Sequence, residues 1–108
     1  MKIASRRDGG KLTISLTGDL DHHAAKKAIP EISKIIDFEF PTSLTLDFKN
    51  VSFMDSSGIA LVIGSFKRAG TIGCSFAVEN VSKQANKVFD AAGIKKVIDI
   101  TEEKILTR

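Results

Sequence analysis

Residues 44–66 read LTLDFKNVSFMDSSGIALVIGSF, and this stretch decides the fold that we expect. Leu44, Leu46 and Phe48 alternate with polar residues, which is the period of a β-strand with one buried face. After the polar segment, apolar residues recur at the spacing of one helix face, at Ile59, Val62, Ile63 and Phe66. The stretch therefore predicts a strand and a helix joined by the loop Asp55-Ser56-Ser57-Gly58.

The residues before this stretch predict a hairpin and a helix. Residues 11–17, KLTISLT, alternate in the same way behind the turn Asp8-Gly9-Gly10, which indicates the second arm of a β-hairpin. Apolar residues at helical spacing follow Asp21, which we expect to cap the helix. Pro30 lies inside this helical pattern. Because proline lacks an N–H and clashes with the preceding turn, we expect a kink or a break near Ile29.

The residues after this stretch predict one more strand, helix and strand. Residues 74–78, CSFAV, form the strand, and the next helix is capped by Ser82 and ended by Gly93. A short last strand is expected over 97–100. Residues 101–103, Thr-Glu-Glu, are expected to begin a terminal helical turn or two.

This order of elements predicts an α/β fold in a single domain spanning residues 1–108. Strands that alternate with helices favour parallel neighbours joined by β-α-β crossovers, and the opening hairpin is antiparallel. We therefore expect a small mixed β-sheet covered by helices. In an open α/β sheet the functional site lies at the carboxyl ends of the strands, where the loop 55–58 is predicted.

Composition and charge exclude several classes of function. The 16 basic and 13 acidic residues are interleaved without a basic run, and no Trp or Tyr is present to stack on bases, so we expect no direct nucleic-acid binding. The chain lacks both an apolar run that could cross a bilayer and the apolar region of a secretory signal. The single cysteine, Cys74, is expected to be a buried thiol. We therefore expect a cytoplasmic protein that binds no membrane.

Three interpretations fit the two serines of the loop. The first is helix capping, for which Asp55 alone would suffice. The second is a catalytic nucleophile, which needs a G-x-S-x-G turn and a base held by a third group. The adjacent histidines His22 and His23 point to different sides of a helix start, and they lack the further ligands of a metal site. We therefore expect no catalytic residue, no metal and no cofactor.

The third interpretation is a modification site. A phosphate adds about −1.5 to −2 charges, which the start of a helix tolerates. A partner docked over the serine would instead have to bury an unpaired dianion. The helix face opposite the apolar stripe offers Ser57, Ala60, Leu61 and Gly64. Its small residues would let a partner approach closely, and Leu61 would be either an exposed anchor or a contact with a neighbouring helix.

Three segments together resemble the STAS-domain anti-sigma factor antagonists of the sporulation and general-stress type. They are LTGDLDHHAAKKA at 16–28, LDFKNVSFMDSSGIALVIGSFKRA at 46–69 and KQANKVFDAAGIKKVIDI at 83–100. The resemblance implies a STAS fold and a non-enzymatic switch. In that family the unphosphorylated antagonist binds an anti-sigma factor, itself a serine kinase that uses ATP, and so frees a sigma factor for transcription. A serine phosphatase resets the cycle.

Carried onto this sequence, the resemblance implies that Ser56 accepts the phosphate. It also implies that the segment 18–23, GDLDHH, lies beside the serine loop on the surface that meets the anti-sigma factor. The expected partner-binding residues are Asp19, Asp21, His22, His23, Asp55, Ser57, Gly58, Ala60, Leu61 and Gly64. The sequence departs from the family at Ala60, where glycine is common, and at Pro30. A STAS module in another assembly, such as a lipid-transporter subunit or a stressosome-type scaffold, is the alternative function.

Overall fold

The computed structural model describes residues 1–103, which form a five-stranded sheet with three α-helices. The elements in chain order are β1 (Lys2–Asp8), β2 (Lys11–Leu20), α1 (His22–Glu39), β3 (Ser43–Met54), α2 (Ser57–Thr71), β4 (Ser75–Val81), α3 (Lys83–Ala92), the short 3-10 helix η1 (Ile94–Lys96) and β5 (Asp99–Glu102). This order confirms the predicted α/β fold. No helix within residues 1–103 is long and apolar enough to cross a membrane.

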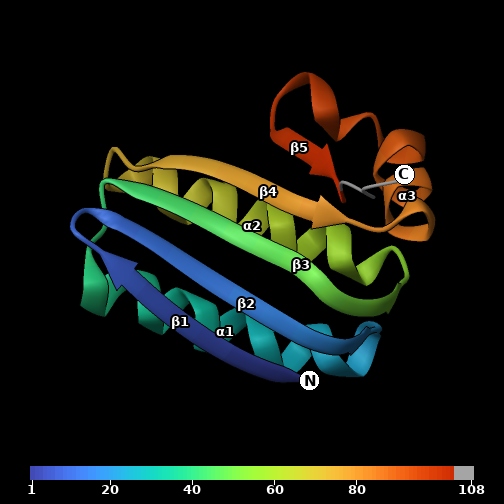
Figure 1. Ribbon diagram of the computed structural model, residues 1–108, viewed down its shortest axis with the longest axis horizontal. Coiled ribbons are helices and arrows are strands. Elements are labelled where there is room, and N and C mark those ends of the chain that lie inside the picture. Colours follow the sequence, from blue (N-terminus) through green and yellow to red (C-terminus); the bar gives the residue numbers. More distant parts are fainter. Residues whose placement is uncertain (104–108) are drawn as a thin grey trace, which may run out of the picture.

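The strands lie in the order β1-β2-β3-β4-β5, so that chain order and spatial order agree. β1 pairs with β2 antiparallel, as the predicted hairpin requires, and the remaining pairs are parallel. Each β-α-β crossover therefore leads to the adjacent strand, always toward the same edge of the sheet. Right-handed crossovers of this kind place their helices on one face of the sheet. Figure 1 shows α1 and α2 side by side behind the sheet, with β1 at one edge.

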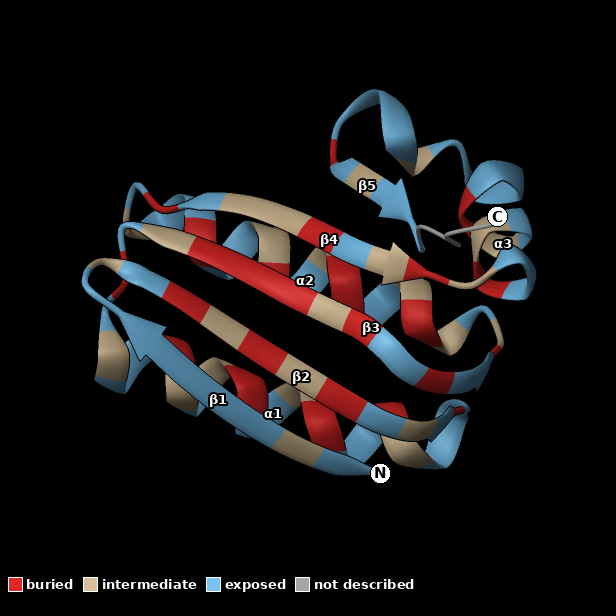
Figure 2. Ribbon diagram, in the orientation of Figure 1, coloured by how far each residue is buried: buried red, intermediate tan, exposed pale blue. Residues whose placement is uncertain are grey.

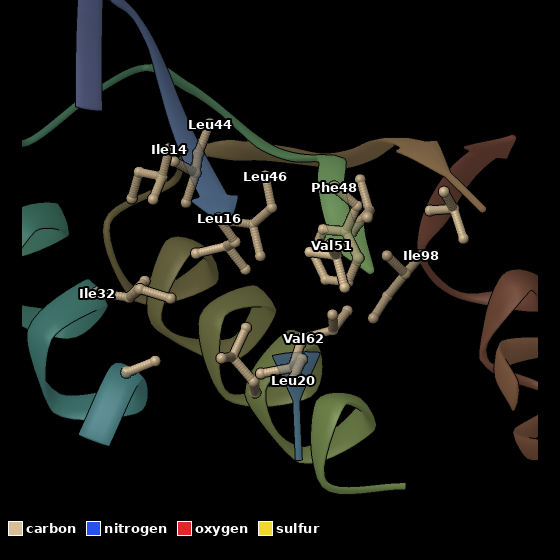
Figure 3. Packing of buried hydrophobic residues seen from close by; sticks show 14 of the residues in the cluster. Ile14, Leu16, Leu20, Ile32, Leu44, Leu46, Phe48, Val51, Val62 and Ile98 are labelled. Atoms are coloured by element: carbon tan, nitrogen blue, oxygen red, sulfur yellow. The ribbon is translucent and has the colours of Figure 1, made fainter. Parts of the chain in front are cut away.

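The core lies between this helix layer and the sheet. In β2 the buried residues Leu12, Ile14 and Leu16 alternate with less buried ones, which Figure 2 shows as alternating bands. In β3 the apolar residues Leu44, Leu46 and Phe48 are buried, and Thr45 between them is buried as well. Leu16, Leu46 and Phe48 point from the strands toward Ile32 of α1 and Val62 of α2 in Figure 3. The alternation that predicted these strands therefore also identified their buried face.

α3 closes the core at the far side of α2. The ring of Phe89, on α3, packs against that of Phe48, on β3, with 6.0 Å between the ring centres. The Ser82 hydroxyl accepts a hydrogen bond from the Ala85 N–H at 3.1 Å, and Gly93 ends the helix with a φ of +69°. Both predicted ends of this helix are thus confirmed.

The predicted break in the first helix and the predicted terminal helix are both wrong. α1 runs without a break from His22 to Glu39, although Pro30 lies inside it. Pro30 is on the exposed face of α1, so the carbonyl that loses its N–H donor faces solvent while the buried stripe holds the helix in place. Thr101 and Glu102 belong to β5 instead of a terminal helix, because they continue the strand that pairs with β4. Residues 104–108, where that helix was expected to continue, lie outside the described residues.

Candidate functional site

The site is formed where β2 and β3 end side by side. Leu20 and Met54, near the ends of these strands, are opposite each other in the parallel register. One step further on, the Asp55 N–H donates a hydrogen bond to the Leu20 carbonyl at 3.2 Å. This pairing brings the predicted segments 18–23 and 55–58 together, although more than thirty residues separate them in the chain.

Asp55 shapes the loop that carries the two serines. Its carboxylate accepts a hydrogen bond from the Ser57 N–H at 2.8 Å, and its carbonyl accepts one from the Gly58 N–H at 3.1 Å. Ser56 occupies the N-cap position of α2, yet its side chain makes no capping hydrogen bond. The capping role therefore belongs to Asp55, and the exposed Ser56 hydroxyl is free for another role.

The segment 18–23 forms the second loop of the site. Asp21 caps α1, as predicted, by accepting a hydrogen bond from the Ala24 N–H at 2.9 Å. Asp19, His22 and His23 are exposed beside it. Asp19, Asp21 and His23 line one surface hollow with Met1, Ile3, Ala24, Lys27, Ala28 and Glu31. Residues 1–103 hold no group of three His, Cys, Asp or Glu side chains arranged to bind a metal ion.

The first turn of α2 faces α1 across a shallow groove. Ser57 and Ala60 line this groove together with His22, Ala25, Lys26 and Ile29 of α1. We call it the α1–α2 groove. Ala60 and Gly64, one turn apart, are both exposed on α2. The structure thus places His22, Ser57 and Ala60 on one continuous surface.

Comparisons with known proteins identify the family of this chain. The family model of the STAS domain matches residues 2–105. The chain belongs to the STAS domain family. The anti-sigma F factor antagonist of Lysinibacillus sphaericus is 34% identical over 98 residues, which cover 90% of this STAS domain and 84% of that protein. The anti-sigma-B factor antagonist of Bacillus subtilis is 29% identical over 105 residues, which cover 94% and 91%.

Solved structures confirm the predicted STAS fold. The anti-sigma factor antagonist SpoIIAA in its unphosphorylated form matches with a TM-score of 0.77 and 29% identity, over 94% of this chain and 90% of that one. The Bacillus cell fate determinant SpoIIAA in its phosphorylated form matches with a TM-score of 0.69 and 29% identity, over 94% and 93%. The sequence resemblance to anti-sigma factor antagonists is therefore confirmed.

One predicted surface residue of the STAS domain is wrongly placed. Leu61 is completely buried, so it is not an exposed anchor. The buried side of α2 consists of Gly58, Leu61, Val62, Ser65 and Ala69. The predicted residues Ile59, Ile63 and Phe66 are only partly buried and pack at the margins of the core. The real buried face is therefore rotated relative to the predicted stripe.

The rotation has a physical cause. α2 lies between α1 and α3 and contacts both, so its apolar residues can be buried in several directions. Ser65 is compatible with burial because its hydroxyl donates a hydrogen bond to the Leu61 carbonyl at 2.8 Å. Gly58 is also buried, and a Cβ there would lie 2.3 Å from Met54 Cγ. Gly58 thus serves the close packing of α2 on β3 and offers little surface to a partner.

Two residues that sequence reasoning missed lie next to the serine loop. Phe53 is 44% exposed at the end of β3, beside Asp19 in the register. The Lys49-Asn50 irregularity could have revealed it, because the register shift there puts Val51 and Met54 in the core and leaves Phe53 outside. Gln84 of α3 hydrogen-bonds the main chain of Met54. No local pattern identifies that long-range contact.

An ion pair at the other end of α2 fixes this helix against α1. Arg68 Nε donates a hydrogen bond to Asp37 Oδ1 at 2.8 Å, and Arg68 Nη2 contacts the second carboxylate oxygen. The hydrogen bond, supported by the charge of Arg68, lowers the pKa of Asp37 below its ordinary value. The same pair raises the pKa of Arg68. Burial raises the pKa of the Cys74 thiol, which is buried as predicted.

Proposed function

We propose that this STAS domain is an anti-sigma factor antagonist whose binding is turned off by phosphate on Ser56. The observation that carries the proposal is the division of roles in the serine loop. Asp55 supplies the hydrogen bonds that shape the start of α2, so the exposed Ser56 hydroxyl has no capping role to lose. A modification of Ser56 can therefore change the surface without unfolding the helix.

The related proteins support this proposal. Curated relatives at 28–34% identity are anti-sigma factor antagonists. A related structure is that of a phosphorylated SpoIIAA, whose fold still matches this chain with a TM-score of 0.69. A phosphate is thus compatible with the fold of that relative.

The switch follows from charge and desolvation. In the unphosphorylated form, the anti-sigma factor covers the two loops and the exposed face of α2 and releases its sigma factor. The anti-sigma factor, acting as a serine kinase, then transfers the γ-phosphoryl group of ATP to Ser56 Oγ. ADP leaves, and the hydroxyl proton passes to the kinase or to solvent. The dianion next to Asp55 cannot be buried unpaired, so the partner dissociates until a serine phosphatase removes the phosphate.

The partner surface in this proposal is smaller than the sequence suggested. It comprises Asp19, Asp21, His22, His23, Asp55, Ser57, Ala60 and Gly64 and gains Phe53, whereas the buried Leu61 and Gly58 drop out. Exposed aromatic residues are frequent energetic centres of interfaces. Phe53 replaces Leu61 as the apolar anchor beside the serine.

The test is mass spectrometry of the protein after incubation with ATP and an anti-sigma factor kinase from the same cell. We expect one phosphate on Ser56, absent in Ser56→Ala and retained in the matched variant Ser57→Ala. Calorimetry should show that Ser56→Ala still binds the anti-sigma factor and that Ser56→Asp binds at least about tenfold more weakly. Binding without any phosphate would instead indicate a constitutive STAS module.

A further inference from the structure

Ser56 opens onto a second groove, between α2 and α3. Its lining consists of Ser56 and Ile59 of α2 with Gln84, Lys87, Val88, Ala91 and Ala92 of α3. We call it the α2–α3 groove. Ile59, Val88 and the two alanines make most of this lining apolar. In the described part of the chain, the polar side chains of this groove are therefore only Ser56, Gln84 and Lys87.

Only one of these polar groups is charged. Gln84 is already occupied, because its side-chain amide bonds both main-chain groups of Met54. Lys87 lies three residues further along α3, on the same helix face and in the same groove as Ser56. Within residues 1–103 the ion pairs are Arg7–Glu39, Arg68–Asp37 and Lys95–Asp90, so Lys87 has no anionic partner there.

The two serines face different cations. Ser57 lines the α1–α2 groove, where the cation is Lys26. Ser56 lines the α2–α3 groove with Lys87. A phosphate on one serine therefore meets a different positive charge from a phosphate on its neighbour. The identity of the modified serine determines which helix supplies the counter-charge.

We propose that Lys87 binds the phosphate on Ser56, with Nζ donating hydrogen bonds to the phosphate oxygens. This inference rests on the proposed function, because it concerns the form modified at Ser56. The ammonium group compensates part of the charge that phosphorylation adds beside Asp55 and holds the phosphate over the α2–α3 groove. Lys87 is thus a positioning residue of the switched-off form.

The proposal predicts a change in the titration of the phosphate itself. A nearby cation favours the doubly charged phosphate, so it lowers the pH at which the second proton leaves. An exposed ion pair of ordinary strength moves that midpoint by about half a pH unit. The effect should decrease in about 1 M salt, which screens exposed charges.

The experiment uses the full chain with phosphoserine incorporated during translation at position 56 or at position 57. The phosphate is titrated by phosphorus-31 NMR, with circular dichroism to verify the fold. With phosphate on Ser56, Lys87→Gln should raise the midpoint, whereas Lys26→Gln and the matched α3 variant Lys83→Gln should leave it unchanged. With phosphate on Ser57, only Lys26→Gln should raise it.

Equal midpoints in Lys87→Gln and Lys83→Gln with phosphate on Ser56 would overturn the proposal. A Lys87→Gln effect of the same size at both serines would also overturn it. The shift would then come from the long-range charge of Lys87 and not from a specific contact with the phosphate on Ser56. Since the phosphoserine is incorporated during translation, this result does not depend on any kinase. Absence of kinase-dependent phosphate on Ser56 would instead count against the proposed function alone.

Discussion

The side-chain amide of Gln84 hydrogen-bonds both the N–H and the carbonyl of Met54. The amide oxygen accepts a hydrogen bond from the Met54 N–H at 2.9 Å, and the amide nitrogen donates one to the Met54 carbonyl at 2.8 Å. Met54 is the last residue of β3, and the serine loop begins directly after it. A single side chain of α3 therefore holds the strand end from which the functional loop starts.

Replacing Gln84 should loosen this strand end. Gln84→Ala removes both hydrogen bonds and leaves two part-buried main-chain groups of Met54 without their partner, which lowers the free energy of unfolding by about 1–3 kcal/mol. The control is Lys83→Ala, an exposed neighbour expected to change the stability by less than about 0.5 kcal/mol. Urea unfolding followed by circular dichroism measures both. Equal stability of the two variants would show that the two Gln84–Met54 hydrogen bonds do not stabilise the protein.

Two glycines of α2 should respond to alanine with opposite signs. At Gly58 a Cβ would lie 2.3 Å from Met54 Cγ and 3.1 Å from Leu20 Cδ2, inside the core. Gly58→Ala should therefore destabilise the protein by about 1–3 kcal/mol. At Gly64 a Cβ would meet nothing within 4 Å, so Gly64→Ala should stabilise the helix by about 0.5–1 kcal/mol. Thermal unfolding of the pair provides the comparison, and a common sign would contradict it.

Neighbouring residues of α2 should separate stability from binding. Leu61→Ala removes a fully buried side chain and should lower the free energy of unfolding by about 2–5 kcal/mol. Ala60→Glu changes an exposed position in the α1–α2 groove, so its stability should stay within about 0.5 kcal/mol of the wild type. Its affinity for the anti-sigma factor should fall at least about tenfold, since the partner must bury the new charge. Unchanged affinity, measured by calorimetry, would place the interface elsewhere.

The Arg68–Asp37 pair should make stability depend on pH in one direction. The folded protein lowers the pKa of Asp37, so the pair stabilises the fold above the ordinary Asp pKa of about 4. This contribution is lost as the pH falls through the lowered pKa. Arg68→Ala should therefore be less stable than the wild type at pH 7, and the difference should shrink at lower pH. Lys67→Ala is the matched control, and carbon-13 NMR of the Asp37 carboxyl group should show a higher pKa in Arg68→Ala.

Local patterns were sufficient for much of this fold. The alternation of Leu44, Leu46 and Phe48 identified both a strand and its buried face, because pleating puts every second side chain on the same side. Asp21 was recognised as a cap because its interaction is also local in the sequence: its carboxylate accepts a hydrogen bond from an N–H only three residues away. The serine loop was placed correctly because it follows directly from the β-α unit.

The orientation of α2 and the contacts of α3 were not accessible in this way. Residues 58–66 are apolar or small on nearly every side, so spacing alone does not distinguish Leu61 in the core from Ile59 at its margin. Gln84 and Lys87 reach the site through tertiary packing of a helix about thirty residues away in the chain. These features depend on which helices flank α2, and periodicity carries no information about that.

The strand β1, at the edge of the sheet, bears on self-association. An exposed edge can pair with a second copy of itself, and charged side chains along it oppose such pairing. Three of the seven residues of β1 are cations, namely Lys2, Arg6 and Arg7. Two such edges laid together would bring like charges into proximity, a repulsion that salt weakens. The cations of β1 therefore oppose the pairing of this edge with the same edge of a second copy, which would join two sheets into one.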